Sequence, residues 1–228
     1  MKLIRTNTPA IDAGRQLSNL LLANTNTPLL LLVSGGTAVS VIEHCDTTLM
    51  GDHITLGLVD ERFSKDPAVL NSAVIETSEF LTDGVKYGAH VLDIAIEDKE
   101  SSDAVADRWE DQLRTWINWY PKGKIFAVLG IGADGHTAGI MPNIHDVDFF
   151  GSRLAMAYTM SKEIDVHTER ITVTFTFLKT YVDEAIVYAV GPQKQKAIDT
   201  MLADDAEPVT LPAAIFKEMK SVQFFTDK

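Results

Sequence analysis

The segment that decides the fold reads Lys124-Ile-Phe-Ala-Val-Leu129 and continues directly into Gly130-Ile-Gly-Ala-Asp-Gly-His-Thr137. After Lys124, its first half is a continuous apolar run, which is typical of a strand buried on both faces of a parallel sheet. Its second half is too rich in glycine to extend the strand, and it carries a carboxylate and an imidazole. Ligands of parallel sheets bind beyond the carboxyl ends of the strands, so we expect functional side chains at this junction.

Two further apolar runs end in the same way. Pro28-Leu-Leu-Leu-Leu-Val33 leads into Ser34-Gly35-Gly36-Thr37, and Ile54-Thr-Leu-Gly-Leu-Val59 leads into Asp60-Glu-Arg62. The carboxyl ends of parallel strands lie along one edge of a sheet, so we expect these loops to converge with the loop after Leu129 on a single site.

Segments of helical periodicity alternate with these strands. The alternation predicts an α/β fold in which helices cover both faces of a mostly parallel, Rossmann-like sheet. No Pro/Gly/Ser-rich linker or run of like charge divides the chain, so we expect a single domain over residues 1–228. The expected helices cover residues 11–21, 39–42, 67–80, 102–120 and 193–202, and the other expected strands lie near residue 91 and at 153–160, 171–177, 185–190 and 221–225.

Trp109 and Trp116 recur at helical spacing with other apolar residues in the long helix expected from Ser102 to Tyr120. This pattern favours a core-facing helix surface over a site for ligand stacking. The only cysteine, Cys45, shows no activating neighbourhood in the sequence, so we interpret it as a structural residue. A single cysteine also excludes a disulfide or a multi-cysteine metal site within the chain.

The charge balance of the chain limits its partners. A formal net charge of −12 argues against binding of nucleic acid or of an anionic membrane, because both require a basic surface. The longest apolar run, Leu29 to Val33, is far shorter than the roughly 20 residues of a membrane-spanning helix. The first residues lack the features of a secretory signal, so a cytoplasmic location is expected.

The glycines of the decisive segment also match the dinucleotide-binding pattern Gly130-x-Gly132-x-x-Gly135. Pro142 leaves too little room for the helix that this pattern requires, and no acidic strand end follows at the right distance to hold a ribose. A metal site is the other alternative that we considered, but the spacing of its candidate ligands matches no metal motif, and a solvated acidic loop explains the later ones. Those candidate ligands are Asp134, His136, His145, Asp146 and Asp148.

Asp134 and His136 fit a general-base pair, in which a carboxylate orients an imidazole and stabilises its charged form. Their place after a strand favours this function over a histidine that only bonds the loop backbone. The Ser34-Gly35-Gly36-Thr37 turn presents backbone N–H groups at the start of a helix, which suits a phosphate. On its own, this turn is equally consistent with a plain tight connection.

Several motifs together resemble those of one known family. The segment Gly130-Ile-Gly-Ala-Asp-Gly-His-Thr-Ala138, followed by Met141-Pro142, resembles the signature Gly-x-Gly-x-Asp-Gly-His-Thr-Ala-Ser-x-x-Pro of the 6-phosphogluconolactonases. Other blocks of that family occur in the same order, so the resemblance spans nearly the whole chain. These blocks are Ser34-Gly-Gly-Thr37, Asp60-Glu-Arg62 with Asn71 downstream, Glu169-Arg-Ile-Thr172, Gly191-x-x-Lys194 and Val222-x-Phe-Phe-x-Asp227.

The related glucosamine-6-phosphate deaminases share the Asp-Gly-His core but continue as His-Ile-Ala-Phe-Asn-Glu-Pro. This chain continues from His136 as Thr-Ala-Gly-Ile-Met-Pro142, so it lacks the glutamate that assists ring opening in the deaminases. The chain also departs from the lactonase pattern, with Ala38 in place of proline, Gly139 in place of serine, His167-Thr168 in place of Pro-Pro and Leu70 in place of the serine before Asn71.

The resemblance implies the glucosamine-6-phosphate isomerase/ribose-5-phosphate isomerase-like fold and hydrolysis of 6-phospho-D-glucono-1,5-lactone to 6-phosphogluconate. It implies no metal or organic cofactor, and its implied partner is a small-molecule sugar phosphate; nothing in the sequence indicates an oligomeric state. His136 is the expected base and Asp134 its partner. The expected substrate- and phosphate-binding residues are Ser34, Gly35, Gly36, Thr37, Asp60, Arg62, Arg170 and Lys194.

Two other functions remain open on the sequence. One is a deaminase or isomerase acting on an amino-sugar phosphate, which would release ammonia from glucosamine 6-phosphate. The other is a noncatalytic phosphosugar-binding regulator, in which replacement of His136 would change no turnover. Arg62 has its own alternative, which is an ion pair with a nearby carboxylate such as Asp60.

Overall fold

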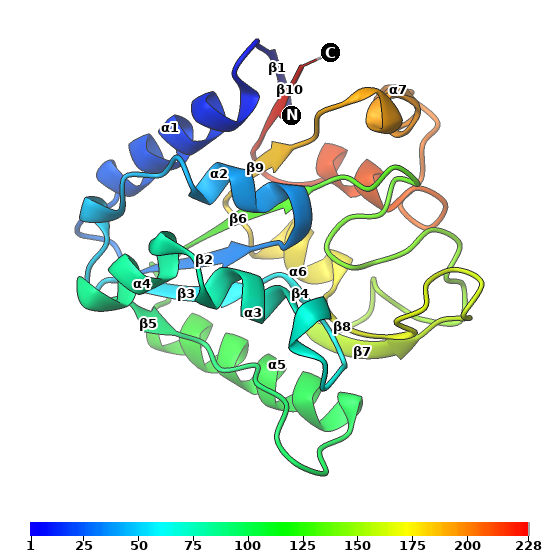
Figure 1. The fold of residues 1–228 in the computed structure, drawn as a ribbon, viewed down its shortest axis with the longest axis horizontal. Coiled ribbons are helices and arrows are strands. Elements are labelled where there is room, and N and C mark those ends of the chain that lie inside the picture. The colour runs from blue at the N-terminus through cyan, green and yellow to red at the C-terminus, as the bar shows by residue number, and fades with distance from the viewer. Residues whose placement is uncertain (228) are drawn as a thin grey trace.

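A parallel sheet forms the centre of the computed structural model, which describes residues 1–227. Its strand order is β1-β10-β9-β6-β2-β3-β5, and every neighbouring pair is parallel (Figure 1). The predicted α/β class and its mostly parallel sheet are therefore confirmed. The strands are β1 (Lys2–Arg5), β2 (Leu29–Val33), β3 (Ile54–Leu58), β5 (His90–Val91), β6 (Lys124–Gly130), β9 (Glu184–Tyr188) and β10 (Val222–Thr226).

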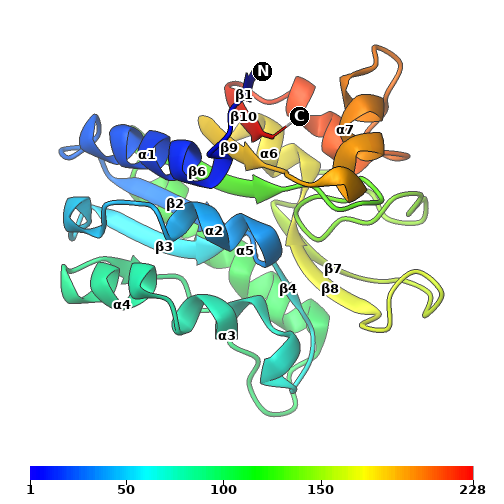
Figure 2. The same cartoon turned by 45° about the horizontal axis from the view of Figure 1, so that its top comes forward.

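Helices cover both faces of this sheet, as Figures 1 and 2 show together. One face carries α1 (Pro9–Leu22), α2 (Val39–Ile42), α3 (Asn71–Glu76) and α4 (Glu79–Lys86). The other face is covered by α5 (Ser102–Trp119) and α6 (Phe175–Thr180), while α7 (Gln195–Leu202) lies beyond the end of β9. The central strands lie between these two layers, and every residue of β2 is buried.

The direction of the connections reverses between β2 and β6. From β2 the chain proceeds through α2 to β3 on one side, whereas from β6 it reaches β9 on the other side. The loops that follow β2 and β6 therefore diverge and leave a crevice at the carboxyl ends of these strands. The decisive glycine-rich segment begins at this point.

A second, antiparallel sheet lies beside the first and has the order β4-β8-β7. Its strands are β4 (Asp60–Arg62), β7 (Ala155–Thr159) and β8 (Glu169–Val173). Val59 joins the two sheets, because its N–H bonds the carbonyl of Val33 and its carbonyl accepts from Val173. This sheet places Asp60-Glu-Arg62, the polar segment that follows the strand predicted at residues 54–59, beside β8.

The structure corrects several predicted elements. The strand predicted at residues 171–177 ends at Val173, because Thr174 caps α6 by accepting a hydrogen bond from the N–H of Phe177. The helix predicted at 67–80 is divided into a 3₁₀ turn, α3 and α4, since the Ser78 side chain caps α4. Strand β1 was not predicted, since only Leu3 and Ile4 of its four residues are apolar and they give no clear apolar run.

The interpretation of the tryptophans is confirmed. Trp109 and Trp116 are 0% and 5% exposed and form part of the core, whereas Trp119, on another face of the same helix, is 74% exposed. Cys45 lies just beyond α2, and burial raises the pKa of its thiol to about 11, as fits a structural cysteine. No helix within residues 1–227 is both long enough and apolar enough to cross a membrane.

Candidate active site

The loops after β2, β3 and β6 meet around a crevice of about 110 Å³. Most of the predicted site residues line it, which brings together segments that lie far apart in the sequence. Its lining comprises Ser34, Gly35, Gly36, Thr37, Asp60, Arg62, Asn71, Gly130, Ile131, Gly132, His136, Thr137, Ala138 and Gly139.

His136 and Asp134 form a close pair at one side of the crevice. The ring Nδ1 of His136 lies 2.6 Å from Oδ1 of Asp134, and the backbone N–H of His136 donates to the same oxygen at 3.1 Å. Burial alone would raise the pKa of Asp134, but the hydrogen bonds and charge of His136 outweigh burial and lower it. An ionised carboxylate only accepts hydrogen bonds, so Nδ1 carries a proton and Nε2 is left for proton transfer. The side chains are 40% and 45% exposed, so water can reach this pair.

Backbone hydrogen bonds hold the loop that carries this pair in a tight turn. The N–H of Gly132 donates to the carbonyl of His136 at 2.8 Å, and Gly135, at a φ of 89°, donates to Gly132 at 3.0 Å. A Cβ on Gly132 would lie 2.1 Å from Nδ1 of His136 and 2.5 Å from Oδ1 of Asp134. The imidazole can therefore pack against this loop only because residue 132 is glycine.

Gly132→Ala is therefore expected to displace the imidazole and to lower the activity of the site by about 10²-fold, since a displacement near 1 Å is enough for such a loss. The matched control is Gly130→Ala, because a Cβ there meets its nearest neighbour at an ordinary 3.7 Å. Steady-state kinetics of both variants, with thermal unfolding to verify the fold, is the measurement. Equal activity of the two variants would contradict the expected displacement.

Arg62 lines the crevice, and two further cationic side chains, Lys194 and Arg170, lie next to residues that line it. Lys194 is 7% exposed, and its Nζ donates to Oγ1 of Thr37 at 2.7 Å; burial lowers the pKa of its ammonium. No carboxylate within residues 1–227 forms an ion pair with Lys194. Arg62 and Arg170 are cross-strand neighbours on β4 and β8. An anion beside Lys194 would offset the desolvation of its ammonium, and an anion beside Arg62 and Arg170 would offset their mutual repulsion.

Arg170 is only partly satisfied by the protein. Its Nη2 donates to Asp165 at 2.7 Å, but its Nη1 is buried and has no hydrogen-bond partner among the described residues. Burial, followed by the charge of Arg62, lowers the pKa of the Arg170 guanidinium. Oγ of Ser34 is likewise buried without a partner in the described part of the chain. Unpaired buried donors are costly, and a bound ligand or a water molecule would complete their hydrogen bonding.

Asp60 also lines the crevice and is 7% exposed. Burial raises the pKa of its carboxyl, and the charges of Arg62, Arg170 and His136 oppose that shift. The side chain of Arg62 donates to the carbonyl of Val69 at 2.5 Å, and no ion pair between Arg62 and Asp60 is found among the described residues. Arg62 therefore remains available to bind an anion.

Sequence reasoning missed one polar residue of the crevice. Asn71 lies in the Asp60 block that we quoted, but its role was not predicted, because nothing in the local pattern indicates that the first residue of α3 reaches the site. His145, Asp146 and Asp148 line a different hollow. Within residues 1–227, no group of at least three His, Cys, Asp or Glu side chains is placed to hold a metal ion.

Comparison with known proteins identifies the family of this chain. Residues 13–225 match the profile described as glucosamine-6-phosphate isomerases/6-phosphogluconolactonase. The chain belongs to this family. A search of curated proteins found no match to the sequence.

Solved structures of the same fold include the 6-phosphogluconolactonase from Trypanosoma brucei, at 19% identity and a TM-score of 0.75, covering 99% of this chain and 95% of that one. A 6-phosphogluconolactonase from Shewanella baltica is 19% identical with a TM-score of 0.77, over 99% and 96% of the two chains. A monomeric glucosamine-6-phosphate deaminase is 18% identical with a TM-score of 0.74, over 100% and 98%.

One departure from the lactonase pattern has a structural explanation in this member of the glucosamine-6-phosphate isomerase/6-phosphogluconolactonase family. Gly139 replaces the serine of the pattern and adopts a φ of 65°, which favours glycine. A Cβ at this position would lie 2.6 Å from Oδ2 of Asp60. The glycine therefore allows the Asp60 carboxyl to pack directly against the loop that carries His136.

Proposed function

We propose that this protein hydrolyses 6-phospho-D-glucono-1,5-lactone to 6-phospho-D-gluconate, as an enzyme of the oxidative pentose phosphate pathway. The observation that carries the proposal is the crevice itself, which is lined by a carboxylate-held imidazole and by Arg62, with Lys194 and Arg170 next to its lining residues. A substrate with a reactive carbonyl at one end and a phosphate at the other matches this arrangement. The 6-phosphogluconolactonases with the same fold support the choice of substrate.

In the proposed reaction, Nε2 of His136 removes a proton from a water molecule as its oxygen bonds to the lactone carbonyl carbon. The bond between that carbon and the ring oxygen then breaks, and the imidazolium returns the proton to the leaving oxygen. Asp134 orients the ring through Nδ1 and stabilises the imidazolium that forms between the two steps. This chemistry requires no metal or organic cofactor.

The phosphate is bound in this proposal by Lys194, Arg62 and Arg170, with the backbone N–H groups of Gly35 and Gly36. Ser34 and Thr37 supply hydroxyl groups beside it, and Asp60 contacts the sugar hydroxyls between the phosphate and the lactone. Each hydrogen bond to a charged group contributes about 1.5–3 kcal/mol, so a few of them offset the unfavourable net charge of the chain.

We also propose that residues 1–228 act as one domain in the cytoplasm.

Deamination of glucosamine 6-phosphate is the second candidate, because a monomeric deaminase with this fold covers the chain fully. Thr137, the residue that follows His136, argues against deamination. Thr137 is 1% exposed and donates its hydroxyl to the carbonyl of Gly130 at 2.8 Å, which fixes the turn in the form described above. The deaminase pattern also has a glutamate four positions after the residue that follows its histidine, where this chain has Met141.

Proton release after addition of freshly generated 6-phosphogluconolactone, corrected for spontaneous hydrolysis, tests the proposal directly. We expect the purified protein to accelerate proton release in proportion to its concentration. A parallel assay for ammonia from glucosamine 6-phosphate is expected to give no signal. A rate equal to the spontaneous one would contradict the lactonase assignment, and ammonia release would support the deaminase instead.

A further inference from the structure

Asn71, the first residue of α3, is 4% exposed and connects two of the loops that form the crevice. Its Nδ2 donates to the backbone carbonyl of Asp60 at 2.9 Å and to Oδ2 of Asp60 at 3.2 Å. Both of these partners are hydrogen-bond acceptors once Asp60 is ionised, so the NH₂ end of the amide must be the end that faces them.

The oxygen end of the same amide lies against the loop after β2. A Cβ on Gly35 would be only 2.0 Å from Oδ1 of Asn71, so the backbone of this turn is in close contact with the amide. Asp60, in turn, packs against Gly139 in the loop after β6. Asn71 and Asp60 therefore form a continuous chain of contacts between the phosphate side of the crevice and the loop that carries His136.

The backbone of α3 is anchored independently of this amide. Oε1 of the buried Glu61 accepts from the N–H of Asn71 at 2.8 Å, and its Oε2 accepts from the N–H of Ser72 at 2.7 Å. Both bonds involve backbone N–H groups, so a change of the Asn71 side chain leaves them in place. The amide can therefore be altered while the helix that carries it stays attached.

We propose that Asn71 is a positioning residue, whose amide holds the Asp60 carboxyl and the Gly35 turn in the relative placement that the substrate requires. The expected effect of Asn71 on turnover rests on the proposed function, whereas its effect on the placement of Asp60 and the Gly35 turn does not. The groups that act on Asp60 electrostatically are Arg62, Arg170 and His136, which favour its ionised form, and Glu61, which opposes it. Asn71 adds a neutral donor directed at one carboxyl oxygen.

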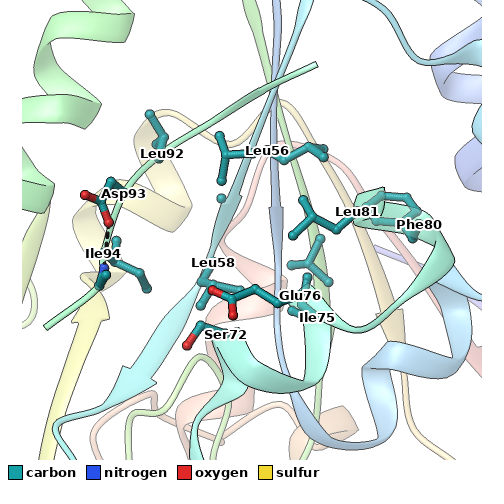
Figure 3. A pocket seen from close by; sticks show the side chains of 14 residues that line it. Leu56, Leu58, Ser72, Ile75, Glu76, Phe80, Leu81, Leu92, Asp93 and Ile94 are labelled. Carbon is teal, nitrogen blue, oxygen red and sulfur yellow. Dashed lines mark hydrogen bonds between the residues drawn. The ribbon is translucent and has the colours of Figure 1, made fainter. Parts of the chain in front are cut away.

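Asn71→Leu is the sharpest test, because it keeps the approximate shape of the side chain and removes the donor and the acceptor without adding a charge. The control is Ser72→Ala on the same helix. Figure 3 shows the Ser72 side chain beside Ile75 and Glu76 at a separate, largely apolar hollow of about 180 Å³, away from the crevice. This variant retains the backbone hydrogen bond to Glu61.

Three measurements define the outcome for these two variants. The kcat/KM for the lactone is expected to fall by about 10²-fold in Asn71→Leu, because Asp60 and the turn lose their relative placement. The pKa of the Asp60 carboxyl, followed by ¹³C NMR and assigned with Asp60→Asn, is expected to rise because a donor to its ionised form is lost. Binding of inorganic phosphate, measured by calorimetry, is expected to weaken, because the Gly35 turn supplies backbone N–H groups to the phosphate in the proposed function. Ser72→Ala is expected to behave as wild type in all three.

An Asp60 titration or a phosphate affinity that is the same in Asn71→Leu and wild type would overturn the proposal. If Asn71→Leu does not fold, Asn71→Ser takes its place, with the same expected directions. A wild type without lactonase activity would contradict the proposed function alone. In that case the titration and the phosphate binding still decide the role of Asn71.

Discussion

Replacement of His136 by alanine is expected to lower kcat for 6-phosphogluconolactone hydrolysis by about 10²- to 10⁴-fold, which is the usual contribution of a positioned general base. The imidazole is held by Asp134 at 2.6 Å and is 40% exposed at the edge of the crevice, so it is positioned and accessible to water. Its loss removes the proton acceptor, while the groups proposed to bind phosphate stay in place. KM is therefore expected to change much less than kcat.

Two further variants make the result on His136 specific. Asp134→Asn keeps the size of the side chain but removes the carboxylate that stabilises the imidazolium, so we expect an intermediate loss of kcat. His145→Ala alters a histidine in a separate hollow and is expected to keep wild-type kinetics. Stopped-flow proton release with the three variants is the measurement. Wild-type kcat in His136→Ala would exclude this residue as the base.

Lys194→Met is expected to raise KM for the lactone by about 10- to 100-fold, since a hydrogen bond to a charged group contributes about 1.5–3 kcal/mol and each 1.4 kcal/mol is a factor of ten. Lys194 is 7% exposed, and its ammonium donates to Thr37 beside the Gly35-Gly36 turn. Methionine has a similar length but no charge, so the phosphate loses one cation without a large change in packing.

The same variant is expected to keep or increase the free energy of unfolding. Burial lowers the pKa of Lys194, which means that the folded state disfavours the ammonium relative to the unfolded state. This unfavourable contribution is present at every pH below the folded pKa and includes neutral pH, so removal of the charge does not destabilise the protein.

Lys196→Met, at an exposed position of α7, is the matched control and is expected to leave KM unchanged. Steady-state kinetics and thermal unfolding at neutral pH measure both effects. A KM unchanged in Lys194→Met would contradict the assignment of this residue to the phosphate, whereas a large drop in Tm would indicate a structural role.

The sequence alone predicted the elements whose signals are local. The apolar runs at residues 29–33 and 125–129 are buried strands, because neighbouring strands and covering helices remove every side chain in them from water. The pairing of Asp134 with His136 was also predictable, since the two residues are separated by one position on a glycine-containing loop. The convergence of three loops followed from a general property of parallel sheets.

Elements without a distinctive local pattern were predicted less well. Strand β1 is half exposed at the edge of the sheet, and the segment after Val173 is apolar in a way that suits either a strand or a buried helix. The side chain of Thr174 decides between these two, because it caps α6 and ends the strand. The division of the helix predicted at 67–80 depends in the same way on the cap at Ser78.

Tertiary structure alone decided which polar groups of the crevice meet. The register of β4 against β8 places Arg62 beside Arg170, and the packing of α3 brings the Asn71 amide to Asp60. Strand register and helix packing depend on contacts between residues far apart in the chain, which the periodicity of either segment does not report. The sequence thus determined the strands, the loops and the candidate base, whereas the fold determined the cation pair, the buried carboxyl and the amide that holds it.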